Sequence, residues 1–333
     1  MTHYTKKFLL IVFIFLFSIA CKQETQSNKI SIITTLFPQY NFAKIVAQDK
    51  ANVSLLLPAG VEVHGFEPTP KDIVKIQNCS LFIYTGEIME PWADKIIETT
   101  KHDKFTSLDL SKNIVLQKNN NLEHAEHDHD GEMHHKDEKE ADEDLHETHH
   151  NHHHGDFDPH FWLSPLNAII MTQDIANALS KIDPENKSFY QKNASNYIIE
   201  LKALHASFIN LFKHTKHKTI VQAGHFAFGY FESVYGLKHI SPYKGFSPDS
   251  EPTAKRIVDI SNTLKNLKIN AIFYEELTDP KIARIIAKQT GAKFYLLHAA
   301  HNVSKNELKN GTSYLEIMKN NLENLKIGLE YTK

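Results

Sequence analysis

Short apolar runs alternate with helical patterns in two separate blocks of the chain, and this alternation constrains the fold more than any other feature. In the first block, helices are predicted at 39–48 and 70–76 between buried strands at Ile30–Thr34, Val53–Leu57 and Leu81–Thr85. The pattern returns after residue 217, with strands at 219–222, 271–274 and 293–297 and helices at 226–235, 252–267, 280–290 and from 313. Such alternation predicts parallel sheets covered by helices, so we expect an α/β protein with two lobes.

One long helix is predicted between the two blocks. It starts at Asp183-Pro184, where proline suits the first turn, and carries one apolar face as far as Leu211. A helix of about 28 residues is about 40 Å long and would connect both lobes stiffly. The expected division is a signal peptide at 1–20, an N-terminal lobe at 21–182, a linking helix at 183–213 and a C-terminal lobe at 214–333.

The N-terminus is typical of an export signal. Two lysines precede an apolar run over 8–20, which is shorter than the roughly 20 residues of a membrane span but suits a signal peptide. The sequence Ser-Ile-Ala-Cys at 18–21 resembles a bacterial lipobox, although Ser18 stands where leucine is usual. We therefore expect acylation of Cys21 and a lipid anchor on the periplasmic or extracellular side of a membrane. The alternative is a plain cleaved signal.

Charge and cysteine content exclude other classes of protein. The formal net charge of −3 provides no basic field for nucleic acid. Cys79 is the one cysteine after Cys21, so neither an internal disulfide nor a CxxC zinc motif is possible in the exported chain. Cys79 is expected to be a small buried residue at the start of a strand.

Histidine is unusually frequent, with 22 residues, and many of them lie in the acidic stretch 119–156. This stretch has too few large apolar residues to fold alone, so a disordered loop is predicted. We expect auxiliary metal binding by its histidines, and a solvated tether is the alternative. These histidines are His124, His127, His129, His134, His135, His146, His149, His150, His152, His153 and His154.

Outside this loop, histidines stand in four turn-like segments: His64, His160, His225, and the pair His298 and His301. Three of the segments follow a predicted strand, and ligands of open parallel sheets bind beyond the carboxyl ends of strands. Two segments come from each lobe, so they predict a shared site in the cleft. Four neutral imidazoles can enclose a Zn²⁺ ion tetrahedrally. His205 and His239, by contrast, are expected to be structural.

The chain resembles the zinc-type metal-binding lipoproteins of bacterial ABC importers, a family that also includes manganese receptors. The resemblance covers roughly residues 28–330 and is carried by four motifs: FEPTP at 66–70, DPHFWLSP at 158–165, HFAFGYF at 225–231 and GTSYLEIM at 311–318. It implies two α/β lobes bridged by one long helix, with the metal between them. It also implies that His64, His160 and His225 are ligands.

The family varies at the fourth ligand, where His301 is favoured, His298 is the competitor, and water or a carboxylate remains possible. Histidine at position 225 is typical of zinc receptors, where manganese receptors carry glutamate. The resemblance implies a monomeric receptor that delivers Zn²⁺ to an ABC permease with its ATPase, not an enzyme. A His-rich insertion before the second motif is also common among the zinc receptors.

Two further points complete the prediction. Glu275 and Glu276 end a strand near the cleft and could support a ligand histidine, but we favour salt bridges to Lys281 and Arg284. The alternatives for function are a manganese or other divalent-metal receptor, an adhesin, or a zinc hydrolase with an open coordination position. The hydrolase is disfavoured because the chain has no GxSxG motif, and its one HExxH match, HETHH at 146–150, lies in the stretch predicted to be a disordered loop and not on a predicted helix.

Overall fold

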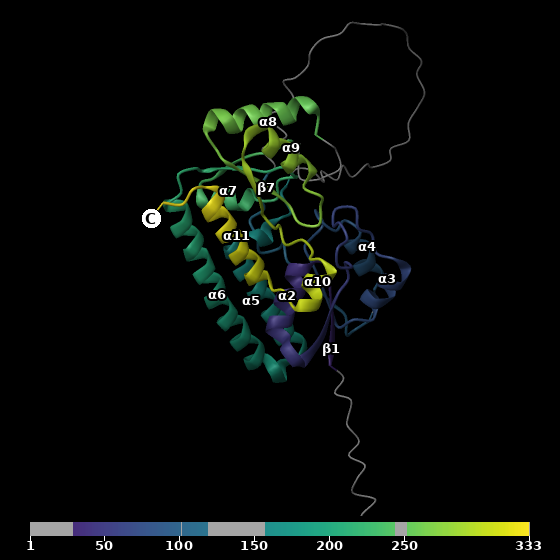
Figure 1. The fold of residues 1–333 in the computed structure, drawn as a ribbon. Helices are drawn as coiled ribbons and strands as arrows, with labels where there is room; N and C mark the ends of the chain where they lie inside the picture. Colours follow the sequence, from purple (N-terminus) through teal and green to yellow (C-terminus); the bar gives the residue numbers. More distant parts are fainter. Residues whose placement is uncertain (1–28, 101, 119–156, 244–251, 333) are drawn as a thin grey trace, which may run out of the picture.

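The computed structural model describes residues 29–100, 102–118, 157–243 and 252–332 (Figure 1). The predicted signal peptide, the acylation site Cys21 and the histidine-rich stretch 119–156 lie outside the described residues. Within the described part, no helix combines the length and the apolar character needed to cross a membrane.

The first sheet is parallel and has the strand order β2-β1-β3-β4. Its strands are β1 (Ile30–Thr34), β2 (Ala51–Leu55), β3 (Leu81–Tyr84) and β4 (Thr106–Asp109), and its helices are α2 (Phe37–Ala47), α3 (Pro70–Gln77) and α4 (Ala93–Thr99). Helix α3 begins where the sequence provides a cap. The Thr69 hydroxyl accepts from the amide of Asp72, the Asp72 side chain accepts from the amide of Thr69, and Pro70 needs no donor in the first turn.

The second sheet repeats the order of the first. Its strands are β5 (Thr219–Val221), β6 (Lys238–Ile240), β7 (Ala271–Tyr274) and β8 (Lys293–Leu296). They form two parallel pairs, β5 with β6 and β7 with β8, and a parallel bridge between Gln222 and Phe273 joins the pairs in the order β6-β5-β7-β8. Its helices are α7 (Gly229–Tyr235), α8 (Ala254–Leu267), α9 (Lys281–Thr290) and α10 (Lys305–Asn310).

Helices α5 (Pro165–Ile182) and α6 (Lys187–Lys213) link the first sheet to the second along the chain, and α11 (Tyr314–Gly328) packs against α6, β7 and β8. Helix α6 has 27 residues and packs against α5, α2 and α11, beside which it runs in Figure 1. Its apolar face is buried as its spacing predicts, at Tyr190, Ala194, Tyr197, Leu201, Leu204, Phe208 and Leu211. One hydrophobic core extends through these helices from the first sheet to the second, so the helices pack the two halves of the chain together.

The predicted α/β class is confirmed, with two parallel sheets, flanking helices and one long helix. The prediction missed β4, β6, α4, α5 and α10. Strands β4 and β6 are sheet edges with polar, partly exposed residues, so they lack the apolar run that marks a buried strand. Cys79 is buried as expected, and burial raises the pKa of its thiol to about 12.

Candidate metal centre

Four histidines from distant parts of the chain meet in one cluster. His64 follows β2, His160 precedes the short 3-10 helix Phe161–Leu163, His225 follows β5 and His301 follows β8. Each offers one ring nitrogen, and these four atoms lie within 4.8 Å of one another. We call this group the four-histidine cluster. Two members precede α6 in the chain and two follow it.

The arrangement is close to a tetrahedron. The six distances between ring centroids in the cluster all fall between 4.9 and 5.6 Å. The Nε2 atoms of His64 and His160 are 3.3 Å apart. Zinc–nitrogen bonds of about 2.0–2.1 Å in a tetrahedron would separate the nitrogens by about 3.4 Å. The His64–His160 pair therefore already has the spacing of a zinc tetrahedron, and the other pairs lie within 4.8 Å.

Burial points to the same use of these nitrogens. His160, His225 and His301 are buried, and the Nε2 atoms of His225 and His301 have no hydrogen-bond partner within the described residues. Buried polar atoms are normally paired, because an unpaired one loses its hydration without replacement. A cation at the centre of the cluster would satisfy both atoms.

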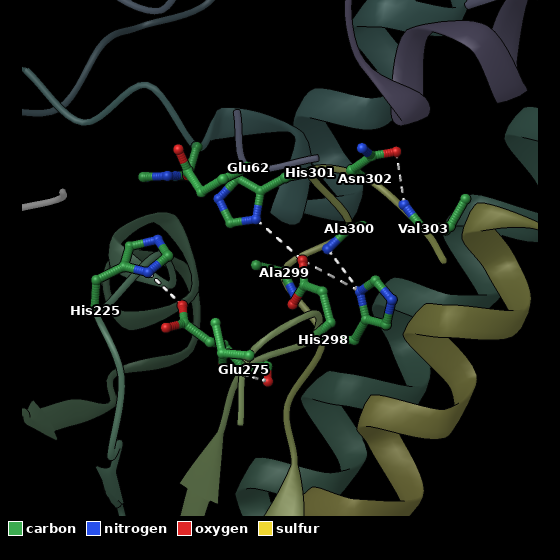
Figure 2. A network of polar contacts seen from close by, with 12 residues as sticks. Glu62, His225, Glu275, His298, Ala299, Ala300, His301, Asn302 and Val303 are labelled. Atoms are coloured by element: carbon green, nitrogen blue, oxygen red, sulfur yellow. Dashed lines mark hydrogen bonds and ion pairs between the residues drawn. The ribbon is translucent and has the colours of Figure 1, made fainter. Parts of the chain in front are cut away.

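Each histidine of the cluster has a carboxylate at its Nδ1 atom. Glu62 lies 2.5 Å from the Nδ1 of His64, Asp158 lies 2.8 Å from that of His160, and Glu276 lies 3.1 Å from that of His301. Glu275 forms the corresponding ion pair with His225, as Figure 2 shows. A carboxylate favours the proton on Nδ1, which leaves the Nε2 lone pair free for a metal and makes it more basic.

Glycine at position 224 makes one of these pairs possible. An added Cβ on Gly224 would lie 2.6 Å from Oε1 of Glu275, well inside contact distance. Only a residue without a side chain therefore lets Glu275 reach His225 in this position.

The charges of the cluster are interdependent. Burial and the neighbouring histidines hold the pKa of His160 well below its usual range. For His225 burial acts to lower the pKa, but the hydrogen bond and charge of Glu275 outweigh it and the pKa is raised. Burial alone would raise the pKa of Glu276, yet His298 and His301 lower it strongly, so this carboxylate is ionised. Negative charge therefore lies beside the cluster where a divalent cation needs compensation.

The prediction for Glu275 and Glu276 was wrong. Both point to histidines, as described above, and Arg284 pairs with Asp279 instead. The strand β7 ends just before them, and Leu277 takes a left-handed conformation (φ 60°) that turns the chain beyond. Sequence reasoning also missed two carboxylates, Glu62 and Asp158, although each stands two residues before its histidine. That repeated acid-x-His spacing was the available signal.

The two candidates for the fourth position are separated by the structure. His301 lies in the four-histidine cluster, whereas His298 does not. The Nδ1 atom of His298 accepts a hydrogen bond from the amide of Ala300 (Figure 2). The Asn321 side chain pairs with the His298 backbone. Ala300 has a left-handed backbone (φ 56°), which turns the chain between the two histidines.

Two other groups of histidines were addressed by the sequence predictions. His205 contacts the Tyr235 hydroxyl, and His239 pairs with Glu232 and stacks on Phe226, so both are structural as predicted. The eleven histidines at 124–154 lie outside the described residues.

A family profile described as "Zinc-uptake complex component A periplasmic" matches residues 32–328. The chain is 35% identical to the zinc-binding lipoprotein AdcA of Streptococcus pneumoniae, over 93% of this chain and 58% of that protein. It is 36% identical to the high-affinity zinc uptake system protein ZnuA of Bacillus subtilis, over 92% of this chain and 89% of that one. The chain thus spans about three fifths of the length of AdcA.

Solved structures give the same picture. The Zn(II)-bound ZnuA-like domain of Streptococcus pneumoniae AdcA superposes with a TM-score of 0.72 at 32% identity, covering 91% of this chain and 100% of that domain. The metal-dependent lipoprotein YcdH of Bacillus subtilis gives a TM-score of 0.73 at 33% identity, with coverages of 90% and 99%.

Proposed function

Since this chain belongs to the family of periplasmic zinc-uptake component A, we propose that it is an exported, lipid-anchored receptor that captures Zn²⁺ and delivers it to an ABC permease. An ATPase bound to the permease would drive uptake. The names of the relatives support each part: zinc binding and a lipid anchor in AdcA, and a high-affinity uptake system in ZnuA. Zinc is the cargo in this proposal, not a resident cofactor.

The observation that carries the proposal is the four-histidine cluster with a carboxylate behind every ring. His64, His160, His225 and His301 are the proposed ligands, each through Nε2. Four neutral nitrogen ligands suit zinc, whereas manganese prefers carboxylate and other oxygen ligands. The Zn(II)-bound relative of the same fold supports this choice.

The coordination number separates a receptor from a hydrolase. A catalytic zinc keeps three protein ligands and an open position for water. With His301 as the proposed fourth ligand, no such opening would be left in the cluster. We therefore infer that the chain is a binding protein and not an enzyme. Because two ligands precede α6 and two follow it, release would require the partner permease to move the 21–182 lobe relative to the 214–333 lobe about the linking segment 183–213.

The stretch 119–156 is proposed as an auxiliary zinc-collecting loop of a monomeric receptor. Its support is the position of its ends. Lys118 and Phe157 form an antiparallel bridge, and the amide of Asp158 donates to the carbonyl of Gln117 at 2.9 Å. Both ends of the stretch therefore lie beside the segment that carries His160.

Zinc stoichiometry and affinity test the proposal. Two proteins are compared, the full chain and a form lacking 119–156, each with and without the triple replacement H64A/H160A/H225A. We expect the triple variant to lose the tight one-to-one site in both forms, while loss of 119–156 removes additional weaker zinc. The double variant H205A/H239A is the matched control, because these histidines lie outside the cluster. Tight equimolar zinc in the shortened triple variant would refute the proposed ligands.

A further inference from the structure

The segment that carries His64 is held to the coil after β8 by the side chain of Asn302 and by one backbone hydrogen bond. We call residues 58–66 the His64 segment; they form a coil that begins after β2 ends at Leu55. The Asn302 Nδ2 atom donates to the carbonyl of Pro58 at 2.7 Å and to that of Val61 at 2.9 Å. Its Oδ1 atom accepts from the amide of Val303 at 2.8 Å. Both amide protons and the oxygen are thus used, and the side chain is 1% exposed.

One further hydrogen bond joins the same two pieces of chain. The amide of Gly60 donates to the carbonyl of Val303 at 2.9 Å. Asn302 directly follows His301 in the chain. Its contacts therefore tie the coil that carries His301 to the segment that carries His64, more than 200 positions away in the sequence. Figure 2 shows His301, Asn302 and Val303 in succession along the coil that follows β8.

The His64 segment also forms one wall of an opening to the cluster. A cavity of about 110 Å³ lies between Val61–Val63 on one side and Glu275–Thr278 on the other, and it reaches His225 and His301. Asn302 lines the same cavity. Of the four clustered histidines, His64 is the most exposed, with 13% of its side chain accessible. A movement of this segment would therefore widen the opening and at the same time withdraw the ring nitrogen of His64 from the cluster.

We propose that Asn302 is a positioning residue that holds the His64 segment closed over the four-histidine cluster and so sets how fast zinc leaves. The inference rests on the proposed function. With Asn302 in place, the carbonyls of Pro58 and Val61 are fixed and His64 stays within reach of the other ligands. Without it, the segment retains the Gly60 contact and its own internal contacts, and the three buried histidines are left to hold the cation while His64 departs and returns.

The test compares zinc release from the full chain and from the variants N302A, N302D and N321A. Asn302→Asp keeps the shape and the acceptor for Val303 but loses both donors to the His64 segment. Asn321 is the matched control, because it is equally buried and fastens the 298–303 coil through His298 without touching the His64 segment. Each protein is loaded with one equivalent of zinc and mixed with excess chelator, and hydrogen exchange of the Gly60 amide is followed in parallel.

We expect N302A and N302D to release zinc up to about thirtyfold faster, since two hydrogen bonds of about 1 kcal/mol each are lost, and to exchange the Gly60 amide faster. The N321A protein should lose thermal stability but release zinc at the wild-type rate. Equal release rates in N302A and wild type, or the same acceleration in N321A, would overturn the role of Asn302. Failure of the proposed function has a different signature, a wild-type protein that takes up no zinc, and would overturn both.

Discussion

Replacing Glu276 by glutamine should weaken zinc binding without disturbing the fold. The Glu276 side chain is 7% exposed, its carboxylate contacts the Nδ1 atom of His301 at 3.1 Å, and its other oxygen accepts from the amide of Ala299 at 2.7 Å. Glutamine has the same shape, but it carries no charge and can present only one oxygen. One of the two donors would then face an amide NH₂ group, or the side chain would turn away from His301.

The magnitude follows from the geometry. Across the ring of His301 and a zinc–nitrogen bond, the cation would lie about 6–7 Å from the Glu276 carboxylate. At an effective dielectric constant of about 20, that attraction is about 5 kcal/mol. Most of it is offset, because in the zinc-free protein the same charge interacts with His298 and His301, which lower the pKa of Glu276. A net loss of 10–100-fold in affinity, about 1.4–2.7 kcal/mol, is therefore expected, as for other carboxylates that support a metal-binding histidine.

Competition with a chromophoric zinc chelator measures this difference for the first equivalent of zinc. The matched control is E232Q, because Glu232 contacts the Nδ1 atom of His239 at 2.9 Å in the same manner but outside the cluster. We expect E232Q to bind zinc as the wild type does. Equal affinities of E276Q, E232Q and wild type would refute the idea that a carboxylate behind the ring strengthens its zinc bond.

Three further outcomes are expected. Because Glu275 raises the pKa of His225, protons compete with zinc for that ring, so affinity should fall as pH drops through this pKa, and E275Q should move the midpoint of a pH titration to lower pH. G224A should push Glu275 away from His225 and weaken zinc about tenfold, whereas G65A, whose added Cβ would meet nothing within 4 Å, should bind normally; equal affinities in the same chelator assay would contradict this. Burial raises the pKa of Glu90 from 4.5 to about 7, so the folded state prefers the protonated acid. The stabilisation of the folded state by protonated Glu90 is complete below the pKa of this group in the unfolded chain, about 4.5, and is lost as the pH rises through about 7. Urea unfolding at about pH 5 and pH 8 should show up to about 3 kcal/mol of this loss in the wild type and little in E90Q.

The class of fold and the identity of the histidines were determined by local sequence. Strands and helices are marked by periodic apolar residues, and the stripe from Tyr190 to Leu211 is buried as its spacing predicts. His64, His160 and His225 stand in motifs that a family resemblance makes specific. These signals act over a few residues, so they survive without knowledge of the packing.

The supporting groups of the cluster were decided by tertiary structure. Glu62 and Asp158 lie two residues from their histidines and could have been found from spacing, but Glu276 and His301 are separated by 25 positions. The sequence also favoured Arg284 as a salt-bridge partner of Glu275 and Glu276, but Arg284 pairs with Asp279 instead. The approach of strand β7 to the coil after β8 gives Glu276 its histidine, and no local pattern records that approach.

The choice between His298 and His301 shows most directly why tertiary structure was needed to identify the members of the cluster. The two residues lie three positions apart in one coil and have similar burial, so composition and spacing do not separate them. The left-handed turn at Ala300 directs them to different sides, and Asn321 from helix α11 fixes the backbone of His298. Sequence alone determined which side chains could bind a cation. The packing of two sheets on shared helices decided which of them meet, because only it sets distances between residues far apart in the chain.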